Sequence, residues 1–447
     1  MTYEEALSYL NSLRNYEQMT VYRYGEVFSL EPTRELLARL GNPQSRYAAL
    51  HVAGTKGKGS TCAFAASILR AAGARVGLYT SPHFLSFRER IQVNGQPIPE
   101  EALAQMVSRI RSFVSPERTF FEVTTACALL YFAEARVDVA VVEVGLGGRL
   151  DATNVVEPRV IGITPISLDH MAQLGQEIRS IAREKAGIIK RNIPVVLSPQ
   201  VPEAQGVVEE TARVRGAFLH RVDEEVQALS VQAGRAGTRL TLRTPEGLYP
   251  DLEIPLVGRH QVMNAMTAVR MVELLAGPGE PLEVPVREGL SQTLWPGRCQ
   301  IIEGAPDLLV DGAHNAASAQ VLRNTIEELF PGRRVWLIFG TSQEKDLAGM
   351  AAVLGSAPGW RLILTKAQVA RAESPERIAE AFRPWHPQPL VTGSVGKALD
   401  QARALADPKD LIVVTGSLFV AGETLQEVGA FSGSFCGAAA PETGFPR

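Results

Sequence analysis

Short apolar runs alternate along the chain with longer segments in which apolar residues recur at helical spacing. In the first half these runs are β-branched, as is typical of buried parallel strands, and they lie at 46–54, 76–80, 139–145, 159–166 and 193–198. Helical spacing covers 60–73 and 121–136 between them. This alternation predicts an α/β fold with a doubly wound, mostly parallel sheet.

The middle of the chain departs from this rhythm. Apolar and polar residues alternate more strictly over 218–256, and turn residues separate the segments. This pattern predicts a small antiparallel patch at the edge of the first domain. A helix is expected at 261–276, and a Pro/Gly-rich break follows at 277–285.

The strand–helix rhythm restarts after residue 299, with strands expected at 307–312, 334–340, 360–365 and 410–416. We therefore predict two domains. The first covers 1–297 and contains the antiparallel patch, and the second is a smaller Rossmann-like α/β domain over 298–430. Residues 431–447 are small, polar and Pro-bearing, which predicts a flexible tail.

Composition narrows the class of protein. The net charge of -3 excludes a broad electrostatic footprint for nucleic acid, although it allows a local basic pocket. The four cysteines form no CxxC pair, and the first residues have neither a basic region nor a long apolar run. No apolar stretch reaches the roughly 18 residues of a membrane span. We therefore expect a cytoplasmic protein with no membrane or nucleic-acid partner.

A glycine-rich segment, residues 53–60, lies between an expected strand and an expected helix. Its glycines let backbone N–H groups close around phosphate oxygens, and the helix N-terminus adds its positive dipole end. Lys58 would meet the β- and γ-phosphates, and the hydroxyl of Ser60 or Thr61 would lie near a metal. Because Gly59 separates lysine from serine, the spacing differs from the common GxxxxGK[ST] loop. The alternative is a glycine-rich turn with solvated lysines.

Several polar side chains follow other strands or lie on a nearby helix. Glu143 ends an apolar strand where open α/β sites form and could hold Mg²⁺, unless it only pairs with a cation such as Arg149. Ser81 and His170 also follow strands, and the alternatives are a turn serine and a structural histidine. Lys185 is expected on an amphipathic helix, where apolar neighbours would lower its pKa, whereas a solvated lysine would be inert.

The second half offers further candidates. Asp311 and His314 follow a strand and would project toward a cleft between the domains. Arg298 lies at the expected hinge, where it could reach phosphates across that cleft. Asn264 could bind an adenine edge or only face a helix surface. Ser417 lies in a strand-to-helix turn that is either a small anion nest or a plain helix N-cap.

Taken together, these segments resemble the folylpolyglutamate synthase and dihydrofolate synthase family, within the wider Mur-ligase group of ATP-dependent amide-forming enzymes. The resemblance runs from about residue 5 to residue 425. It is carried by LGNPQ (40–44), HVAGTKGKGS (51–60), YTSPHFLSFRERIQVNG (79–95), FFEV (120–123), EVGLGGRLDATN (143–154), LDH (168–170), EKAGIIK (184–190), WPGR (295–298), DGAHN (311–315) and TGSLF (415–419). The order and number of these motifs make the resemblance far more specific than the glycine-rich loop alone.

The resemblance implies roles for individual residues. The ATP site comprises Gly57, Lys58, Gly59, Ser60, Asn264, Arg298 and Asp311; the magnesium ligands are Ser81, Glu143 and His170; Lys185 is the lysine that is carbamylated; the pteroate-binding residues are Phe120, Phe121, Glu122, Leu150, Asp151 and Ala152; and His314 and Ser417 lie near the incoming glutamate. Lys58, Glu143, His170 and Lys185 form the implied catalytic set. The family also implies two magnesium ions and leaves potassium open.

The implied activity is an ATP-dependent ligase with an N-terminal ATP-binding domain and a C-terminal glutamate-ligase domain. Its substrates would be ATP, L-glutamate, and dihydropteroate or reduced folates, and its intermediate would be an acyl phosphate. The GGRLDATN version of its motif resembles that of bifunctional enzymes, and the family resemblance as a whole implies a monomer. Two departures stand out. Lys56 occupies a loop position where asparagine is commoner, and residues 24–36 match the usual pterin-side stretch only loosely, which leaves the acceptor preference open.

Two other functions compete with this interpretation. A Mur-type peptidoglycan ligase would share fold and chemistry, but the phosphate loop begins by residue 54 and leaves too little chain for a separate N-terminal UDP-binding domain. A nucleotide-binding ATPase without ligase activity would need the loop and a magnesium carboxylate. It would not need DGAHN, WPGR and EKAGIIK together.

Overall fold

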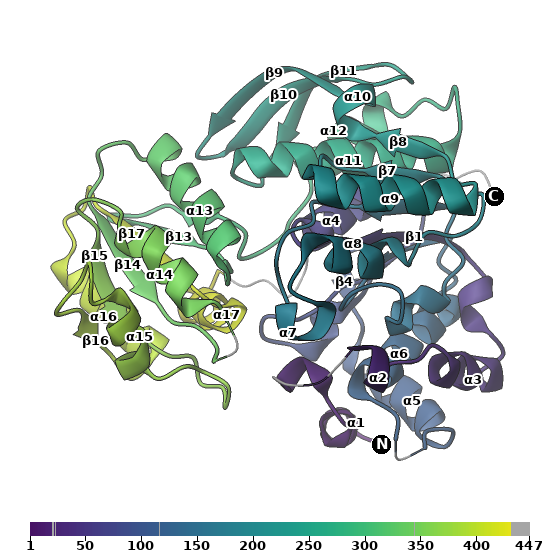
Figure 1. Ribbon diagram of the computed structural model, residues 1–447, viewed down its shortest axis with the longest axis horizontal. Helices are drawn as coiled ribbons and strands as arrows, with labels where there is room; N and C mark the ends of the chain where they lie inside the picture. The colour runs from purple at the N-terminus through teal and green to yellow at the C-terminus, as the bar shows by residue number, and fades with distance from the viewer. Residues whose placement is uncertain (20–21, 23, 116, 344, 431–447) are drawn as a thin grey trace.

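The computed structural model describes residues 1–19, 22, 24–115, 117–343 and 345–430 and contains three sheets (Figure 1). The predicted flexible tail, 431–447, lies outside the described residues. We call the part with the eight- and three-stranded sheets the N-terminal unit and the part with the six-stranded sheet the C-terminal unit, which lies on the left of Figure 1. The predicted boundary at residue 298 falls between helix α12 (Glu283–Ser291) and strand β12 (Gln300–Ile302).

The eight-stranded sheet has the order β4-β3-β2-β5-β1-β6-β7-β8. Its strands are β1 Ala48–Ala53, β2 Val76–Tyr79, β3 Ile91–Val93, β4 Gln96–Pro97, β5 Val139–Glu143, β6 Val160–Ile163, β7 Val195–Leu197 and β8 Leu219–Arg221. The six strands from β2 to β8 in this order are parallel, and β3 and β4 add an antiparallel edge. The doubly wound α/β fold predicted from the apolar runs is confirmed.

Helices cover both faces of this sheet because successive strand residues point to opposite sides. Leu50 and Val52 of β1 belong to one apolar core, with α4 (Lys58–Ala71), α11 (Arg259–Ala276) and α12. Ala49 belongs to the opposite core, with α1 (Tyr3–Ser12), α3 (Glu31–Arg39), α5 (Glu100–Arg111) and α6 (Phe120–Glu134). Beside it lies a further core, formed under α8 (Ile178–Ala186) and α9 (Pro202–Arg215). No helix of the described residues is long and apolar enough to cross a membrane.

The predicted antiparallel patch is a separate three-stranded sheet of order β11-β10-β9, with β9 Gln227–Gly234, β10 Gly237–Arg243 and β11 Leu248–Ile254. Its apolar residues, such as Leu240 and Leu252, pack into the core under α11 and α12. The prediction is wrong at its start. There, β8 pairs in parallel with β7 and so extends the eight-stranded sheet instead of joining the antiparallel one. The short helix α10 (Val222–Glu225) follows it.

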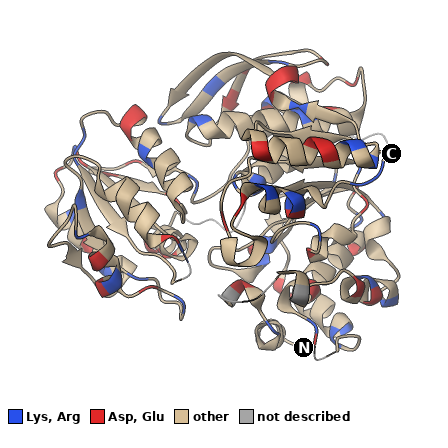
Figure 2. Cartoon of the chain, in the orientation of Figure 1, with Lys and Arg blue, Asp and Glu red and all other residues tan. Residues whose placement is uncertain are grey.

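The C-terminal unit has a six-stranded sheet of order β12-β13-β17-β14-β15-β16, parallel except for β12. Its other elements are β13 Asp307–Val310, β14 Val335–Phe339, β15 Arg361–Leu364, β16 Leu390–Val391, β17 Leu411–Thr415, α13 Ala316–Leu329, α14 Leu347–Gly355, α15 Pro375–Phe382, α16 Val395–Leu405 and α17 Leu418–Glu427. The residues of α13, α14 and α15 form one core, and those of α16 and α17 form the other. Acidic and basic residues are interspersed over both units in Figure 2, consistent with the small net charge.

A buried network of charges joins the three-stranded sheet to α11. Arg270 has a side chain only 5% exposed and pairs with Glu225 at 2.7 Å and with the fully buried Glu273 at 3.1 Å. Glu273 also accepts hydrogen bonds from the hydroxyls of Tyr249 and Thr244. Removing one member of such a pair leaves an uncompensated buried charge, which costs far more than losing an exposed pair.

We expect Arg270→Met to lower the free energy of unfolding by about 3–5 kcal/mol, because Glu273 then loses its buried cation. The measurement is the urea unfolding transition of the full chain. Arg213→Met is the matched control, since Arg213 pairs with Glu210 on the exposed surface of α9, and it should leave the transition where it is. Equal effects of the two substitutions would contradict this account.

Candidate functional site

The phosphate loop connects β1 to α4, and two of its glycines cannot be replaced without movement. Gly54 has φ +150, and a β-carbon there would lie 1.9 Å from Thr164 Oγ1. Gly57 is the N-cap of α4 with φ +86 and without a capping side chain, so the first amides of the helix stay available. Uncapped amides and the helix dipole suit an anion at this end of α4.

Lys58, Glu143 and Ser81 meet at the end of the parallel strands. Lys58 Nζ lies 3.8 Å from Glu143 Oε1, and the Ser81 backbone N–H donates to Glu143 Oε2 at 3.2 Å. Burial raises the pKa of Glu143, and the Lys58 cation acts in the opposite direction. Arg149, the partner considered from the sequence, instead pairs with Glu184 at 2.9 Å.

The donor set at this point suits a magnesium ion. Glu143 offers a carboxylate, and Ser81 lies beside it with a hydroxyl, which are the oxygen ligands that Mg²⁺ prefers. The described residues contain no group of three His, Cys, Asp or Glu side chains that would hold a metal by themselves, so water and phosphate oxygens would complete the shell. His170 lies after β6 in a left-handed conformation, and its imidazole is 4.0 Å from Asp169.

Lys185 lies on the predicted helix, α8, which ends at Ala186 with Gly187 as its C-cap. Its side chain is buried, and its Nζ donates to the Gly54 carbonyl of the phosphate loop at 2.7 Å. Burial, together with the nearby Lys58 cation, lowers the pKa of Lys185 to about 7. The solvated lysine considered as an alternative is therefore excluded, because the side chain is buried.

The three other nucleotide candidates surround the loop and the junction of the units. Asn264 on α11 is buried, and its Oδ1 lies 2.3 Å from where a β-carbon on residue 57 would be. The Arg298 guanidinium lies over the Phe84 ring, 5.4 Å from its centroid. Asp311 is buried and accepts hydrogen bonds from the N–H groups of Cys299 and Ala313, each at 2.8 Å. Its carboxylate therefore connects the turn after β13 to the residue just before β12.

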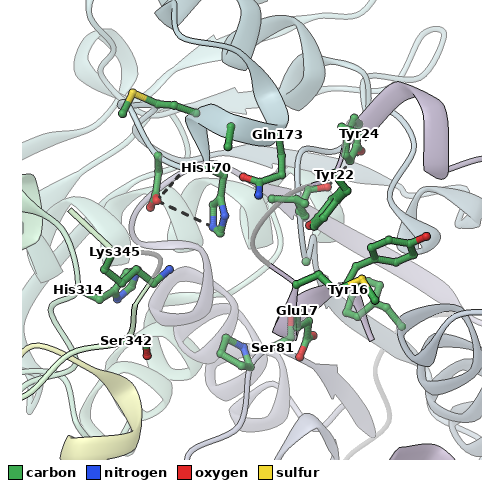
Figure 3. Close-up of a pocket in the computed structure, with 18 of the residues that line it drawn as sticks. Tyr16, Glu17, Tyr22, Tyr24, Ser81, His170, Gln173, His314, Ser342 and Lys345 are labelled. Carbon is green, nitrogen blue, oxygen red and sulfur yellow. Dashed lines mark hydrogen bonds and ion pairs between the residues drawn. The ribbon is translucent and has the colours of Figure 1, made fainter. Parts of the chain in front are cut away.

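A cavity of about 850 Å³ lies between the two units (Figure 3). Nine of the predicted residues line it. Seven come from the N-terminal unit, Ser81, Phe121, Glu122, Leu150, Asp151, Ala152 and His170, and two from the C-terminal unit, His314 and Ser417. Phe120 does not line it, because its ring is buried in the core with the Arg90 guanidinium 5.3 Å from its centroid. Lys58 and Glu143 lie behind the wall, and Ser81 connects them to the cavity.

One wall of the cavity consists of aromatic residues that the motifs did not reveal. Tyr16 packs edge-on against Tyr22 at 4.9 Å and against Phe28 at 5.0 Å, and Tyr24 lies 5.2 Å from Phe28. Figure 3 shows Tyr16, Tyr22 and Tyr24 on the side of the cavity away from His314. The only signal in the sequence is the density of aromatics over 16–28, which partly overlaps the loosely matching stretch 24–36.

The C-terminal unit supplies the facing wall. His314 Nδ1 bonds the Gly312 carbonyl at 2.9 Å, which leaves Nε2 as the acceptor nitrogen. The Ser417 hydroxyl accepts from the Phe419 N–H at 3.1 Å as the N-cap of α17, so the plain N-cap describes its contacts. Lys345 and Arg371 also line the cavity, and neither belongs to a motif noted in the sequence.

Comparison with known proteins agrees with this architecture. Residues 52–272 match the Mur ligase middle domain, and residues 297–418 match the Mur ligase glutamate ligase domain. The folylpolyglutamate synthase of Lacticaseibacillus casei is 36% identical over 95% of this chain and 98% of its own length. A protein of Haloferax volcanii named a probable bifunctional folylpolyglutamate synthase/dihydropteroate synthase is also 36% identical, and this chain spans 50% of its length.

Solved structures are similar over nearly the whole chain. Mycobacterium tuberculosis folylpolyglutamate synthase complexed with ADP has a TM-score of 0.87 and 34% identity, covering 96% of this chain and 98% of that one. Escherichia coli FolC in complex with DHPP and ADP has a TM-score of 0.84 and 32% identity, with the same coverage. The motifs, the two-unit fold and these relatives establish that the chain belongs to the folylpolyglutamate synthase and dihydrofolate synthase family of Mur ligases.

Proposed function

We propose that this protein is an ATP-dependent ligase that adds L-glutamate to dihydropteroate and to the γ-carboxylate of reduced folates. The observation that carries the proposal is the position of Ser81, which lines the large cavity and also donates its N–H to Glu143 beside the phosphate loop. An acceptor in the cavity would thus lie next to a nucleotide on the loop. Relatives named for one or both activities, and a related structure with both DHPP and ADP, support this arrangement.

The nucleotide would bind with its phosphates on Gly57, Lys58, Gly59 and Ser60 at the N-terminus of α4. Asn264 presses against this loop, and Arg298 and Asp311 lie at the junction of the units, where we assign further nucleotide contacts. Magnesium would be held by Ser81, Glu143 and His170. When bound, it would withdraw charge from the transferred phosphoryl group.

The pteroate would lie in the cavity, where Phe121 and Leu150 offer apolar surface and Glu122, Asp151 and Ala152 surround it. Phe120 would act from the core by supporting the start of α6. The aromatic wall suits a flat heterocyclic or benzoyl ring, because planar rings stack on or pack against aromatic side chains. His314 and Ser417 on the facing wall would lie toward the incoming glutamate.

The acceptor carboxylate must be activated before an amine can attack it, because its oxide is a poor leaving group. An oxygen of the acceptor carboxylate attacks the γ-phosphorus of ATP, the bond to ADP breaks, and an acyl phosphate forms. The glutamate amine, after losing a proton, attacks the carbonyl carbon, and inorganic phosphate leaves as the amide forms. Lys58 would neutralise charge on the transferred group, and the enclosed position between two units would keep water from the acyl phosphate.

Lys185 is assigned as a carbamylated lysine. Carbamate formation needs a neutral amine, and burial with the Lys58 cation lowers the pKa of Lys185 to about 7. The product would be an anion buried beside the phosphate loop, where it would face Lys58 and orient the loop or its metal. We further propose that the protein acts as a cytoplasmic monomer.

The first test is ADP release in a coupled assay with dihydropteroate and with reduced folates, each with L-glutamate and ATP. We expect release only when acceptor and glutamate are both present, and chromatography should show the glutamylated products. ATP turnover without an acceptor would favour an ATPase without ligase activity. Release with a UDP-muramoyl substrate would favour a peptidoglycan ligase.

For Lys185→Ala we expect turnover to fall at least about a hundredfold, because the proposed anion beside the phosphate loop is lost. A short-chain carboxylate such as acetate should restore part of the activity by occupying the vacated space. Lys185→Arg is the control, since it fills that space with a cation and should not respond to acetate. Normal turnover of the alanine variant would remove the carbamate from the mechanism.

For Gly57→Ala we expect nucleotide affinity to fall about tenfold or more, because a left-handed alanine costs about 1–2 kcal/mol and its β-carbon collides with Asn264. The measurement is calorimetric titration with ADP. Gly206→Ala on α9 is the matched control, because nothing lies within 4 Å of a β-carbon there. Unchanged ADP affinity in Gly57→Ala would contradict the placement of the phosphates.

A further inference from the structure

One lysine of the phosphate loop, Lys56, contacts the C-terminal unit. Lys56 Nζ lies 3.0 Å from Asp169 Oδ2 in the N-terminal unit and 3.3 Å from His314 Nε2 in the C-terminal unit. The same Asp169 oxygen accepts from Asn315 Nδ2 at 3.1 Å. We call Lys56, Asp169, His314 and Asn315 the bridging cluster. Two of its members come from each unit, and the pairs that cross between the units are about 145–260 residues apart along the chain.

The hydrogen-bond directions in the bridging cluster are determined by its contacts. His314 donates from Nδ1 to the Gly312 carbonyl, so its Nε2 lone pair accepts from the Lys56 ammonium. Asp169 Oδ2 accepts from the Lys56 ammonium at 3.0 Å and from the Asn315 amide at 3.1 Å, so both of its partners in the cluster are donors. Lys56 therefore serves a carboxylate and an imidazole at once, one on each side of the cleft.

This contact differs from an ordinary surface ion pair. The side chains of Lys56 and Asp169 are only 27% and 14% exposed, so water screens their interaction weakly. Asn315 is also the N-cap of α13, and its Oδ1 accepts from the Ser318 N–H. The Asn315 side-chain amide is therefore held both by the first turn of α13 and by Asp169. The bridging cluster thus ties the phosphate loop to the first turn of a C-terminal helix.

Two other cations lie near Lys56 in the bridging cluster. Lys345 lines the cavity beside His314 in Figure 3, and Lys58 follows two residues later in the phosphate loop. Both are cations, and Asp169 is the carboxylate that Lys56 contacts. Without Lys56, Nε2 of His314 would lose its donor in the cluster and its ring would be held only through Nδ1.

We propose that Lys56 is a positioning residue that holds the C-terminal unit against the phosphate loop and orients the His314 imidazole toward the cavity. The geometry of the bridging cluster carries this assignment. Its consequence for glutamate rests on the proposed function, because His314 is assigned to the glutamate side of the cavity. Lys56 is also the loop position where the sequence departs from the asparagine common in the family, and asparagine is too short to reach both partners.

The first experiment measures steady-state kinetics of Lys56→Asn and Lys56→Met with ATP, dihydropteroate and glutamate. We expect the glutamate KM to rise about tenfold, the effect of losing a charge-assisted contact, while the ATP KM stays within about threefold, since the Lys56 charge is already paired. Lys56→Arg should recover part of the glutamate KM, because it retains the cation and its reach. A purely structural role would change stability without this split between substrates.

The second experiment compares the radius of gyration of the variants with that of the unmodified protein, measured by small-angle X-ray scattering of the full chain without ligands. We expect a larger radius of gyration for Lys56→Asn and for Asp169→Asn than for the unmodified protein. Lys409→Asn, which removes an exposed cation from the turn before β17, is the matched control and should leave the radius unchanged.

The outcomes separate the two proposals. If the unmodified protein shows no glutamate-dependent ADP release, the proposed ligase function fails, and the scattering comparison still decides whether Lys56 holds the units together. If the enzyme is active but Lys56→Asn keeps both the glutamate KM and the radius of gyration, Lys56 is not a positioning residue. A fall in glutamate KM would also overturn the proposal, because the contact would then hinder glutamate.

Discussion

The parallel pairing of β1 with β5 and β6 is the constraint on which the site depends. Its register places Val52 opposite Glu143, so the phosphate loop starts just where the carboxylate of β5 ends its strand. Lys58 then lies within 3.8 Å of Glu143, and the Ser81 N–H reaches the same carboxylate from the strand on the far side of β5. Because parallel strands end at a common edge of the sheet, the end of β5 and the segments that follow β1 and β2 bring their side chains together there.

The two units are joined by more than the linker between them. Phe84 follows β2 in the N-terminal unit, yet it belongs to the apolar core of the C-terminal unit that includes residues of α16 and α17. Arg298, at the start of the C-terminal unit, lies over that ring, and the bridging cluster adds a polar contact on the phosphate-loop side. An apolar anchor and a polar tie at separate points define the relative position of two bodies better than either does alone. The cavity between the units depends on that position.

Much of the fold follows from apolar patterning. The buried strands β1, β2, β5, β6 and β7 were predictable because strands covered on both faces are continuously apolar. The edge strands β3 and β4 were not predictable, because strands of three and two residues are too short to show an alternation of apolar and polar residues. The parallel pairing of β8 with β7 was not predicted either. Leu219, His220 and Arg221 form a short, partly polar segment, and whether it pairs in parallel depends on the neighbouring strand.

The sequence by itself determined the phosphate loop, the positions of the buried strands along the chain and the family, because these depend on residues that are neighbours along the chain. Tertiary structure decided which side chains face the cavity: of two adjacent phenylalanines, Phe121 lines it and Phe120 is buried in the core. It also decided that Glu143 meets Lys58 rather than Arg149, and that Lys56 reaches His314. These contacts join residues about 80–260 positions apart, so they exist only once packing has brought the segments together.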